Sequence, residues 1–348
     1  MAPRRCPPVQ SPTGNTAKQI FIFTSTGFRR ITASEYASWM KSLQADIMVP
    51  LADLPHTSLT PSSKKLMRMK DHTEDWLDEF LFVLGQSAEE ANIFAPVLPM
   101  EYPIQWDYLR NIAEDMLDRI KGLAIYDANL LPDLANYDAF GSLPKLSLDP
   151  PATPHEVLRQ VSLGVDMVFT PFINNTSDAG VALSFTFPAR ERNDKPLQLG
   201  DDMWSPDNRA RVDPIVPNCP CYACTAHHRA FINHLLNAKE MLGWTLLQVH
   251  NHHVMSAFFS GIRETLNNGG AEAFETERKR FGEVYDAELP KGTGERPRAR
   301  GYHFKSEEGG GKFNKPGWQV ENGVVDTQLV AEGKDGNDLE EKGFAQKQ

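Results

Sequence analysis

Three cysteines lie within six residues, in Cys219-Pro-Cys221-Tyr-Ala-Cys224, and His250 follows after 25 intervening residues. Three thiolates and an imidazole are the donor set of a closed, tetrahedral Zn²⁺ site, which leaves no position for a reacting water. The chain has four cysteines, and three of them are here. A reduced protein has no disulfide use for such a cluster, so metal binding is the better interpretation. We predict one structural Zn²⁺ held by Cys219, Cys221, Cys224 and His250. The alternative is a chance cluster beside an ordinary core histidine.

The composition is that of a folded domain. The 348 residues can bury a sizeable core, and the net charge of -10 argues against a protein that binds polyanions over its whole surface. RNA contact would need a local basic patch, for which Arg190, Arg192, Arg209 and Arg211 are candidates, although a solvated loop explains them more simply. No apolar run approaches the roughly 18 residues of a membrane span. The first 19 residues lack the apolar core of a secretory signal, so we expect an intracellular, reducing location.

Apolar runs of strand length alternate with helical segments along the chain. The expected strands are 45–53, 93–100, 123–128, 145–149, 165–170 and 244–250. The expected helices are 62–85, 106–122, 154–163, 226–243, 252–268 and 271–282, with one more from a capping box at Thr32–Glu35 to about Gln44. Strands that are apolar throughout and separated by helices indicate a parallel sheet buried on both faces.

The ends of the chain differ in composition from its middle. Residues 1–17 are predicted to be disordered, 18–286 to fold, and 287–348 to form a disordered tail rich in Gly, Glu and Lys. Within the folded part, the strand rhythm pauses at 173–218, where "VALSFTF" predicts a hairpin strand.

The cysteine–histidine motif, the flanking "RAFINHLL" and "LLQVHN", and Gly164-Val-Asp-Met167 resemble the tRNA-guanine (queuine) transglycosylases over about residues 28–285. The resemblance implies a (β/α)₈ TIM-barrel-like fold with an inserted zinc subdomain at about 205–250. The family's first two barrel strands have no counterpart here. As the explanation we favour a truncated sequence over a barrel that is completed in a different way. The family's His-Asn dipeptide selects His250 as the ligand over His252 and His253.

The same resemblance implies that this chain lacks the catalytic groups. Active members carry a nucleophilic aspartate that attacks the ribose C1′ of the target guanosine. That position is Phe169 here, and Asp166, three residues earlier, is expected to point to the other face of its strand as a structural carboxylate. Asp46 still resembles the family's base-recognising position, but its partner groups are missing, and a half-matched polar pocket is costly.

The resemblance therefore implies a non-catalytic, accessory chain, with no catalytic residues of its own, in a heterodimer with a catalytic queuine tRNA-ribosyltransferase subunit. The complex would exchange guanine for queuine at wobble position 34 of tRNAs with GUN anticodons, and this chain would contact tRNA through the complex. The zinc subdomain and helix 226–243 would pair this chain with the catalytic subunit. We expect neither a DNA partner nor a transmembrane segment. We expect the protein to be cytoplasmic, and the resemblance to the family also suggests peripheral association with the mitochondrial outer membrane. Two alternatives stay open: an active transglycosylase with an unrecognised nucleophile, and a zinc-dependent RNA-binding structural protein.

Overall fold

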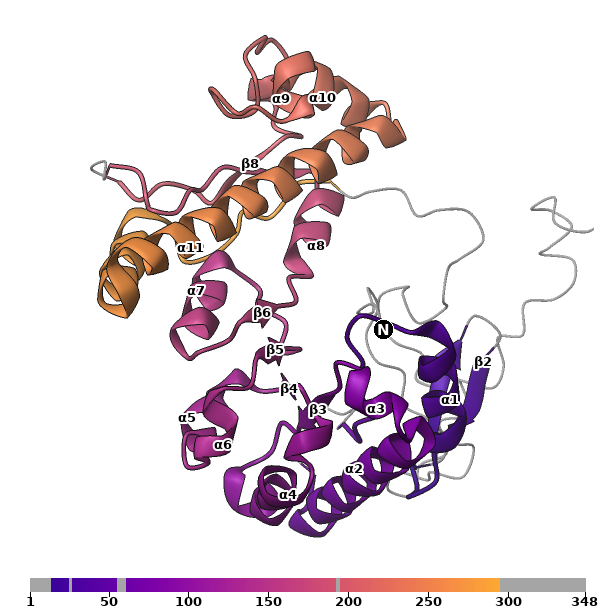
Figure 1. Ribbon diagram of the computed structural model, residues 1–348. Helices are drawn as coiled ribbons and strands as arrows, with labels where there is room; N and C mark the ends of the chain where they lie inside the picture. The colour runs from indigo at the N-terminus through magenta and orange to yellow at the C-terminus, as the bar shows by residue number, and fades with distance from the viewer. Residues whose placement is uncertain (1–13, 25–26, 55–60, 192–194, 295–348) are drawn as a thin grey trace, which may run out of the picture. The chain divides into compact units, whose positions relative to one another are not determined.

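The structure is a computed structural model and describes residues 14–24, 27–54, 61–191 and 195–294 (Figure 1). Its strands are β1 (Gln19–Thr24), β2 (Gly27–Thr32), β3 (Phe94–Val97), β4 (Gly122–Ile125), β5 (Lys145–Ser147), β6 (Met167–Val168), β7 (Val181–Leu183) and β8 (Gly200–Asp202). Its helices are α1 (Ala33–Leu43), α2 (Ser63–Leu84), α3 (Ser87–Glu90), α4 (Tyr102–Asp115), α5 (Leu131–Leu134), α6 (Asp138–Gly141), α7 (Pro154–Ser162), α8 (Phe172–Asp178), α9 (Tyr222–Ala226), α10 (Arg229–Asn237) and α11 (Met241–Val284). None of these helices is both long enough and apolar enough to cross a membrane.

The predicted capping box opens α1. The Thr32 hydroxyl accepts a hydrogen bond from the backbone N–H of Glu35, and the Glu35 carboxylate accepts one from the backbone N–H of Thr32. The helix ends at Gln44, which adopts a left-handed conformation. Both ends of this helix agree with the sequence prediction, because a capping box satisfies backbone groups that a helix start leaves free.

Four of the predicted strands form one parallel sheet in the order β3-β4-β5-β6, with helices between them along the chain (Figure 1). All residues of β3 and β4 are buried, and α2 and α4 contribute apolar side chains to the same core. The run at 45–53 contributes less than expected, a single parallel bridge from Met48 to Ile93. Pro50 follows closely and has no N–H to extend the ladder. The prediction of an α/β fold with a parallel sheet is confirmed.

The C-terminal part of the described chain is organised by α11. This helix contacts α7, α8, α9, α10 and β7. The predicted hairpin is present, with β7 pairing antiparallel to β8. A cluster of aromatic rings, Phe185, Phe187, Phe258, Phe274 and Phe281, fills the core between the hairpin region and α11. The hairpin is therefore held against the helix that carries His250.

The prediction of a strand at 244–250 is wrong, because these residues form the first part of α11. Buried positions along this helix include Trp244, Leu247, Asn251 and Val254, which are three or four residues apart. Taken alone, a seven-residue apolar run does not distinguish a strand from a buried helix. The predicted helices at 252–268 and 271–282 are the continuation of α11, which breaks its helical geometry at Gly270.

The single helix predicted at 226–243 is also wrong. The chain forms α9 and α10 instead, separated by extended backbone at His227 and His228. The His228 ring accepts a hydrogen bond from the Phe231 N–H at 3.1 Å and so caps α10, while Lys239 ends that segment with a φ of 58°. A smaller difference affects the helix predicted at 106–122, which as α4 begins and ends earlier.

Packing reaches slightly beyond both predicted ends of the folded region. The Asn15 side chain donates to Asp53 at 2.8 Å, and the Thr293 hydroxyl donates to Asp202 at 2.8 Å. The rest of the segments predicted to be disordered, residues 1–13 and 295–348, lies outside the described residues.

Candidate metal centre

The sequence around the cysteines places two of them on one turn of helix. Cys221 is the residue before α9, and Cys224 lies within that helix. The Cys221 carbonyl accepts the backbone N–H groups of Cys224 and Thr225, which fixes the turn. Cys219 precedes this helix in a turn, in which the Cys219 N–H donates to the Val216 carbonyl at 3.3 Å. A short helical turn thus directs the cysteines toward one point.

His250 lies in α11 and reaches the cysteines from the opposite side. Its Nδ1 is 3.4 Å from Sγ of Cys221, 3.4 Å from Sγ of Cys224 and 3.9 Å from Sγ of Cys219. The four donor atoms all lie within 4.8 Å of one another. A tetrahedral Zn²⁺ with ordinary Zn–S and Zn–N bonds would set S···N at about 3.6 Å. The donor set and its spacing fit a metal ion with four protein ligands.

The second ring nitrogen of His250 is also engaged. Nε2 lies 2.8 Å from the carbonyl oxygen of Leu183 in β7. Because a carbonyl only accepts, Nε2 carries the hydrogen, and the lone pair of the neutral ring is on Nδ1, which faces the sulfurs. His250 is 0% exposed, so water does not compete for either nitrogen.

The sulfur atoms and the imidazole perturb one another's pKa values. Burial lowers the pKa of His250, but hydrogen bonds to the three sulfurs outweigh it and raise the pKa to about 11. Burial raises the pKa of Cys219, but its hydrogen bonds to His250 and Cys221 outweigh it and lower the pKa to about 6. The cage therefore favours an imidazolium beside a thiolate, and a metal ion would replace the proton on His250.

An apolar shell surrounds this cluster and is built from four parts of the chain. Ala182 comes from β7, Ile215 from the loop before the cysteines, Ile232 from α10 and Trp244 from α11, and all four are buried. Such a shell excludes water and links the metal site to the packing of the whole subdomain.

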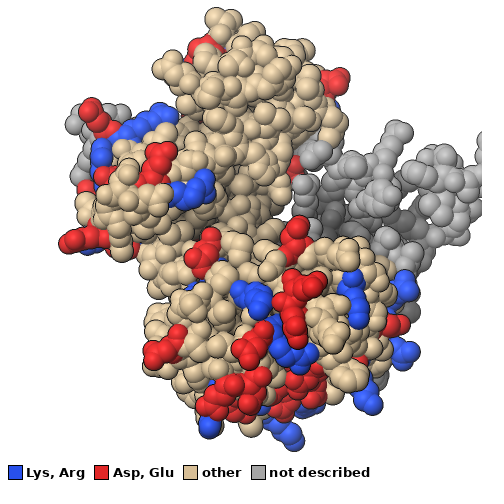
Figure 2. All heavy atoms as spheres, viewed as in Figure 1, with Lys and Arg blue, Asp and Glu red and all other residues tan. Residues whose placement is uncertain are grey.

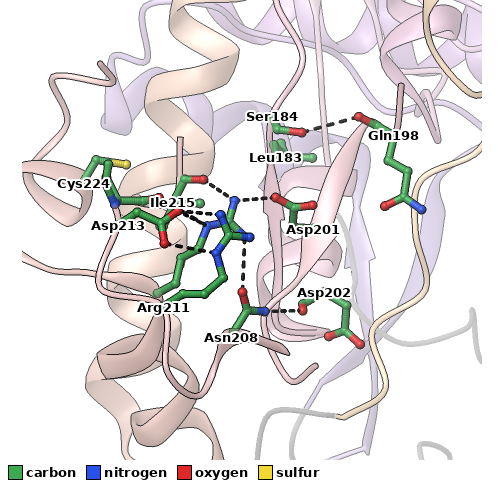
Figure 3. A network of polar contacts seen from close by, with 12 residues as sticks. Leu183, Ser184, Gln198, Asp201, Asp202, Asn208, Arg211, Asp213, Ile215 and Cys224 are labelled. Carbon is green, nitrogen blue, oxygen red and sulfur yellow. Dashed lines mark hydrogen bonds and ion pairs between the residues drawn. The ribbon is translucent and has the colours of Figure 1, made fainter. Parts of the chain in front are cut away.

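A polar network centred on Arg229 holds the loop that leads to the cysteines, and Figure 3 labels its members Asp201, Asn208 and Ile215. The Arg229 guanidinium donates to the carbonyl oxygens of Pro214 and Ile215 and to Oδ1 of Asn208, and it pairs with the Asp201 carboxylate at 2.7 Å. Arg229 is 7% exposed. One buried cation therefore ties the start of α10 to β8 and to the loop before Cys219.

The other histidines and arginines singled out from the sequence do not belong to the group of ligand residues that the described part of the chain brings together. His252 is exposed, and its Nε2 lies 2.8 Å from Nε2 of Gln248. His253 is not one of the four clustered ligand residues. Arg211 pairs with Asp213 at 2.6 Å. Arg190 and Arg209 are exposed, and Arg192 lies outside the described residues.

The residues compared with the family's active site lie beside the strands of the parallel sheet, or just before the segment that bridges to it. Asp166 precedes β6, and its carboxylate accepts the backbone N–H of Lys145, the first residue of β5, at 2.8 Å. That contact is at the amino end of the sheet, whereas ligands of open parallel α/β sheets bind at the carboxyl ends of the strands. Phe169 follows β6 at the carboxyl end and is half-buried. Asp46 is exposed and precedes the bridged Met48, at the amino side of its segment.

Sequence reasoning missed the role of Arg229 and the contact between His250 and the predicted strand β7. Arg229 appeared only as one residue of a predicted helix, because its partners lie 14 to 28 positions away. The Leu183 carbonyl is a backbone group, which no residue type announces. The family's His-Asn dipeptide served only to select His250, and the contacts of Asn251 were not expected.

Comparison with known proteins shows the family of this chain. Residues 6–283 match the family described as queuine tRNA-ribosyltransferase. The chain belongs to the queuine tRNA-ribosyltransferase family. Within this family it is 31% identical to queuine tRNA-ribosyltransferase accessory subunit 2 of Schizosaccharomyces pombe, over 95% of this chain and 74% of that protein. It is 30% identical to the Culex quinquefasciatus protein of the same name, over 70% of this chain and 60% of the relative.

The Xenopus laevis protein of that name is 28% identical over 75% of this chain and 73% of its own length. The chain thus spans about three quarters of the yeast and frog relatives and about three fifths of the mosquito relative.

Proposed function

We propose that this chain is the non-catalytic accessory subunit of a heterodimeric queuine tRNA-ribosyltransferase. The assembly exchanges guanine for queuine at wobble position 34 of tRNAs with GUN anticodons, and the catalytic chemistry belongs to the partner. The names of the relatives support the accessory role. The observation that carries the proposal is local, the absence of a carboxylate where the nucleophile of this family is expected.

A phenyl ring at Phe169 can neither attack the ribose C1′ nor stabilise the positive charge that develops there. Asp166 does not replace the nucleophile, because it is bonded to the backbone of β5 at the amino end of the sheet. We also propose that the parallel sheet is an arc of a (β/α)₈ barrel. In that fold, chemistry belongs to the carboxyl end of the strands.

The metal of this subunit is proposed to be one structural Zn²⁺, held by Cys219, Cys221, Cys224 and His250. Four protein donors leave no open position, so the ion would supply folding free energy rather than catalysis. Bound there, it would join α9 to α11 and, through the His250 ring, to β7. The subdomain that carries the ion would then present a rigid surface to a partner.

The proposed interface is the outer surface of α9, α10 and the start of α11. Few Lys, Arg, Asp or Glu side chains appear over α9 and α10 on the face shown in Figure 2. Tyr222 is 61% exposed, Leu242 is 47% exposed, and the Phe231 ring is half-buried and stacks on His227 at 4.9 Å. Aromatic anchors with few charges are typical of the centre of a stable interface. Leu235, by contrast, is 7% exposed and packs in the subdomain's own core.

Co-expression with a catalytic homologue tests the pairing. Size-exclusion chromatography with light scattering should give a one-to-one heterodimer. Phe231→Asp should weaken it without removing zinc. Asn237→Asp is a matched control, an exposed position on the same helix that already carries a polar side chain. Separate elution of the two unmodified subunits would contradict the accessory role. Pairing that is indifferent to Phe231 would leave the role intact and displace the interface.

A further inference from the structure

The side chain of Asn251, the neighbour of His250, pairs with the backbone of β7. Its Oδ1 accepts the Leu183 N–H at 2.8 Å, and its Nδ2 donates to the Val181 carbonyl at 2.9 Å. Nδ2 also lies 2.9 Å from the Ser177 hydroxyl. Asn251 is 0% exposed. The amide therefore makes three hydrogen bonds in a dry environment, where each is costly to lose.

These contacts occupy the edge of β7 that β8 leaves open. On the β8 side, the Ser184 N–H donates to Leu199 and the Met203 N–H donates to Gly180. Alternate residues of a strand direct their backbone groups to opposite edges. The backbone N–H and C=O groups of Val181 and Leu183 therefore point toward α11. There the side-chain amide of Asn251 pairs with them as a peptide group of a neighbouring strand would.

Asparagine is the residue type that this position requires. The site needs one acceptor and two donors at the end of a short side chain, which aspartate and leucine do not provide. The Ser177 hydroxyl donates its own hydrogen to the Ile173 carbonyl at 2.7 Å, so it accepts from Nδ2. That contact fixes which end of the amide faces Leu183.

The same β7 residue that Asn251 holds is the partner of the metal-site histidine. The Leu183 N–H is bound by Asn251, and the Leu183 carbonyl accepts from Nε2 of His250 at 2.8 Å. A partner of this kind selects the tautomer and the orientation of a metal-binding imidazole. We propose that Asn251 is a positioning residue of the metal centre. By fixing the Leu183 carbonyl it keeps Nδ1 of His250 available and aimed at the sulfurs, although it touches no ligand atom itself.

This inference rests on the proposed zinc site, and the test separates the two. The full chain is loaded with Zn²⁺ and titrated with a chromophoric chelator, beside a Co²⁺-loaded sample whose absorption reports three sulfurs and one nitrogen. If the unmodified chain binds no Zn²⁺, the zinc site itself is wrong. If it binds one, Asn251→Leu should weaken affinity by about 10- to 100-fold and change the Co²⁺ spectrum, as loss of an outer-shell partner does.

A matched control is available in the same subdomain. Asn233 is 3% exposed, and its Nδ2 donates to the carbonyls of Met203 and Ser205, with no contact to His250. Asn233→Leu should lower the stability of the subdomain but leave affinity within about twofold and the Co²⁺ spectrum unchanged. Equal losses in the two variants, or an unchanged Asn251→Leu, would overturn the proposal.

Nitrogen-15 NMR of the unmodified zinc-loaded chain provides a second test that needs no variant. His250 should show Nδ1 bound to the metal and a hydrogen on Nε2 that exchanges slowly with water. Coordination through Nε2, or rapid exchange of that hydrogen, would contradict the role of the Leu183 carbonyl and so of Asn251.

Discussion

Replacing Arg229 by alanine should destabilise the subdomain that carries the cysteines. The guanidinium is almost fully buried and has four hydrogen-bond partners: two carbonyl oxygens of the loop before Cys219, Oδ1 of Asn208 and the carboxylate of Asp201. The Asp213 carboxylate lies farther from it, at 3.6 Å, and Figure 3 labels Asp201, Asn208, Asp213 and Ile215. Alanine would leave the two carbonyls and the carboxylate without this donor. It would also remove the packing of the arginine stem.

The expected cost follows from these partners. Hydrogen bonds from a charged donor contribute about 1.5 to 3 kcal/mol each, and breaking a buried pair costs about 3 to 5 kcal/mol. The Asp201 side chain is 37% exposed, so water would partly replace its lost partner and the ion pair itself must be discounted. We expect Arg229→Ala to lower the free energy of unfolding by about 3 kcal/mol, near the lower end of that range.

Arg211→Ala is the matched control. Arg211 pairs with the same Asp213 that lies 3.6 Å from Arg229, but its side chain is 49% exposed. Urea unfolding followed by circular dichroism should show a clear loss for Arg229→Ala and none beyond error for Arg211→Ala. Hydrogen exchange should accelerate in residues 211–224 for the first variant alone. Equal effects of the two substitutions would refute the argument that burial decides the contribution.

Three further outcomes follow from the same packing. Cys221→Ser should lose bound zinc and, with it, the heterodimer, as metal analysis beside light scattering would show; full zinc occupancy would sink the ligand assignment. Leu235→Asp should unfold the subdomain and release zinc. Phe231→Asp changes a half-buried side chain, so this variant should keep its zinc. In thermal unfolding, Gly261→Ala should be strongly destabilising, because its Cβ would collide with the backbone carbonyl oxygen of Phe187. Gly282→Ala, in open space on the same helix, should instead stabilise by up to about 1 kcal/mol, and equal effects would show that the close approach is wrong.

Local signals predicted much of the fold. Residues 32–35 carry both halves of a capping box, so four neighbouring positions are enough to predict the start of α1. The apolar runs that became β3 and β4 are buried throughout, which is what two-sided burial of a parallel sheet requires. The cysteine spacing likewise pointed to a ligand cluster, and the structure brings His250 to it from another element.

What could not be predicted depends on contacts between distant residues. Taken alone, the run 244–250 predicts a strand, because its helical spacing becomes evident only with the buried positions that follow it in α11. The interruption of the predicted helix at His227 and His228 depends on a ring nitrogen that caps α10. The Arg229 network joins residues far apart in sequence, so neither periodicity nor motif spacing reports it.

The account's central claim is that this chain supports base exchange without performing it. The most direct measurement is incorporation of labelled queuine or guanine into a tRNA with a GUN anticodon, by this chain alone, by a catalytic homologue alone and by their mixture. We predict no incorporation by this chain alone, no covalent tRNA adduct on it, and higher activity of the mixture than of the homologue alone. An adduct trapped on this chain by itself would contradict the account, because Phe169 would then not mark a lost nucleophile.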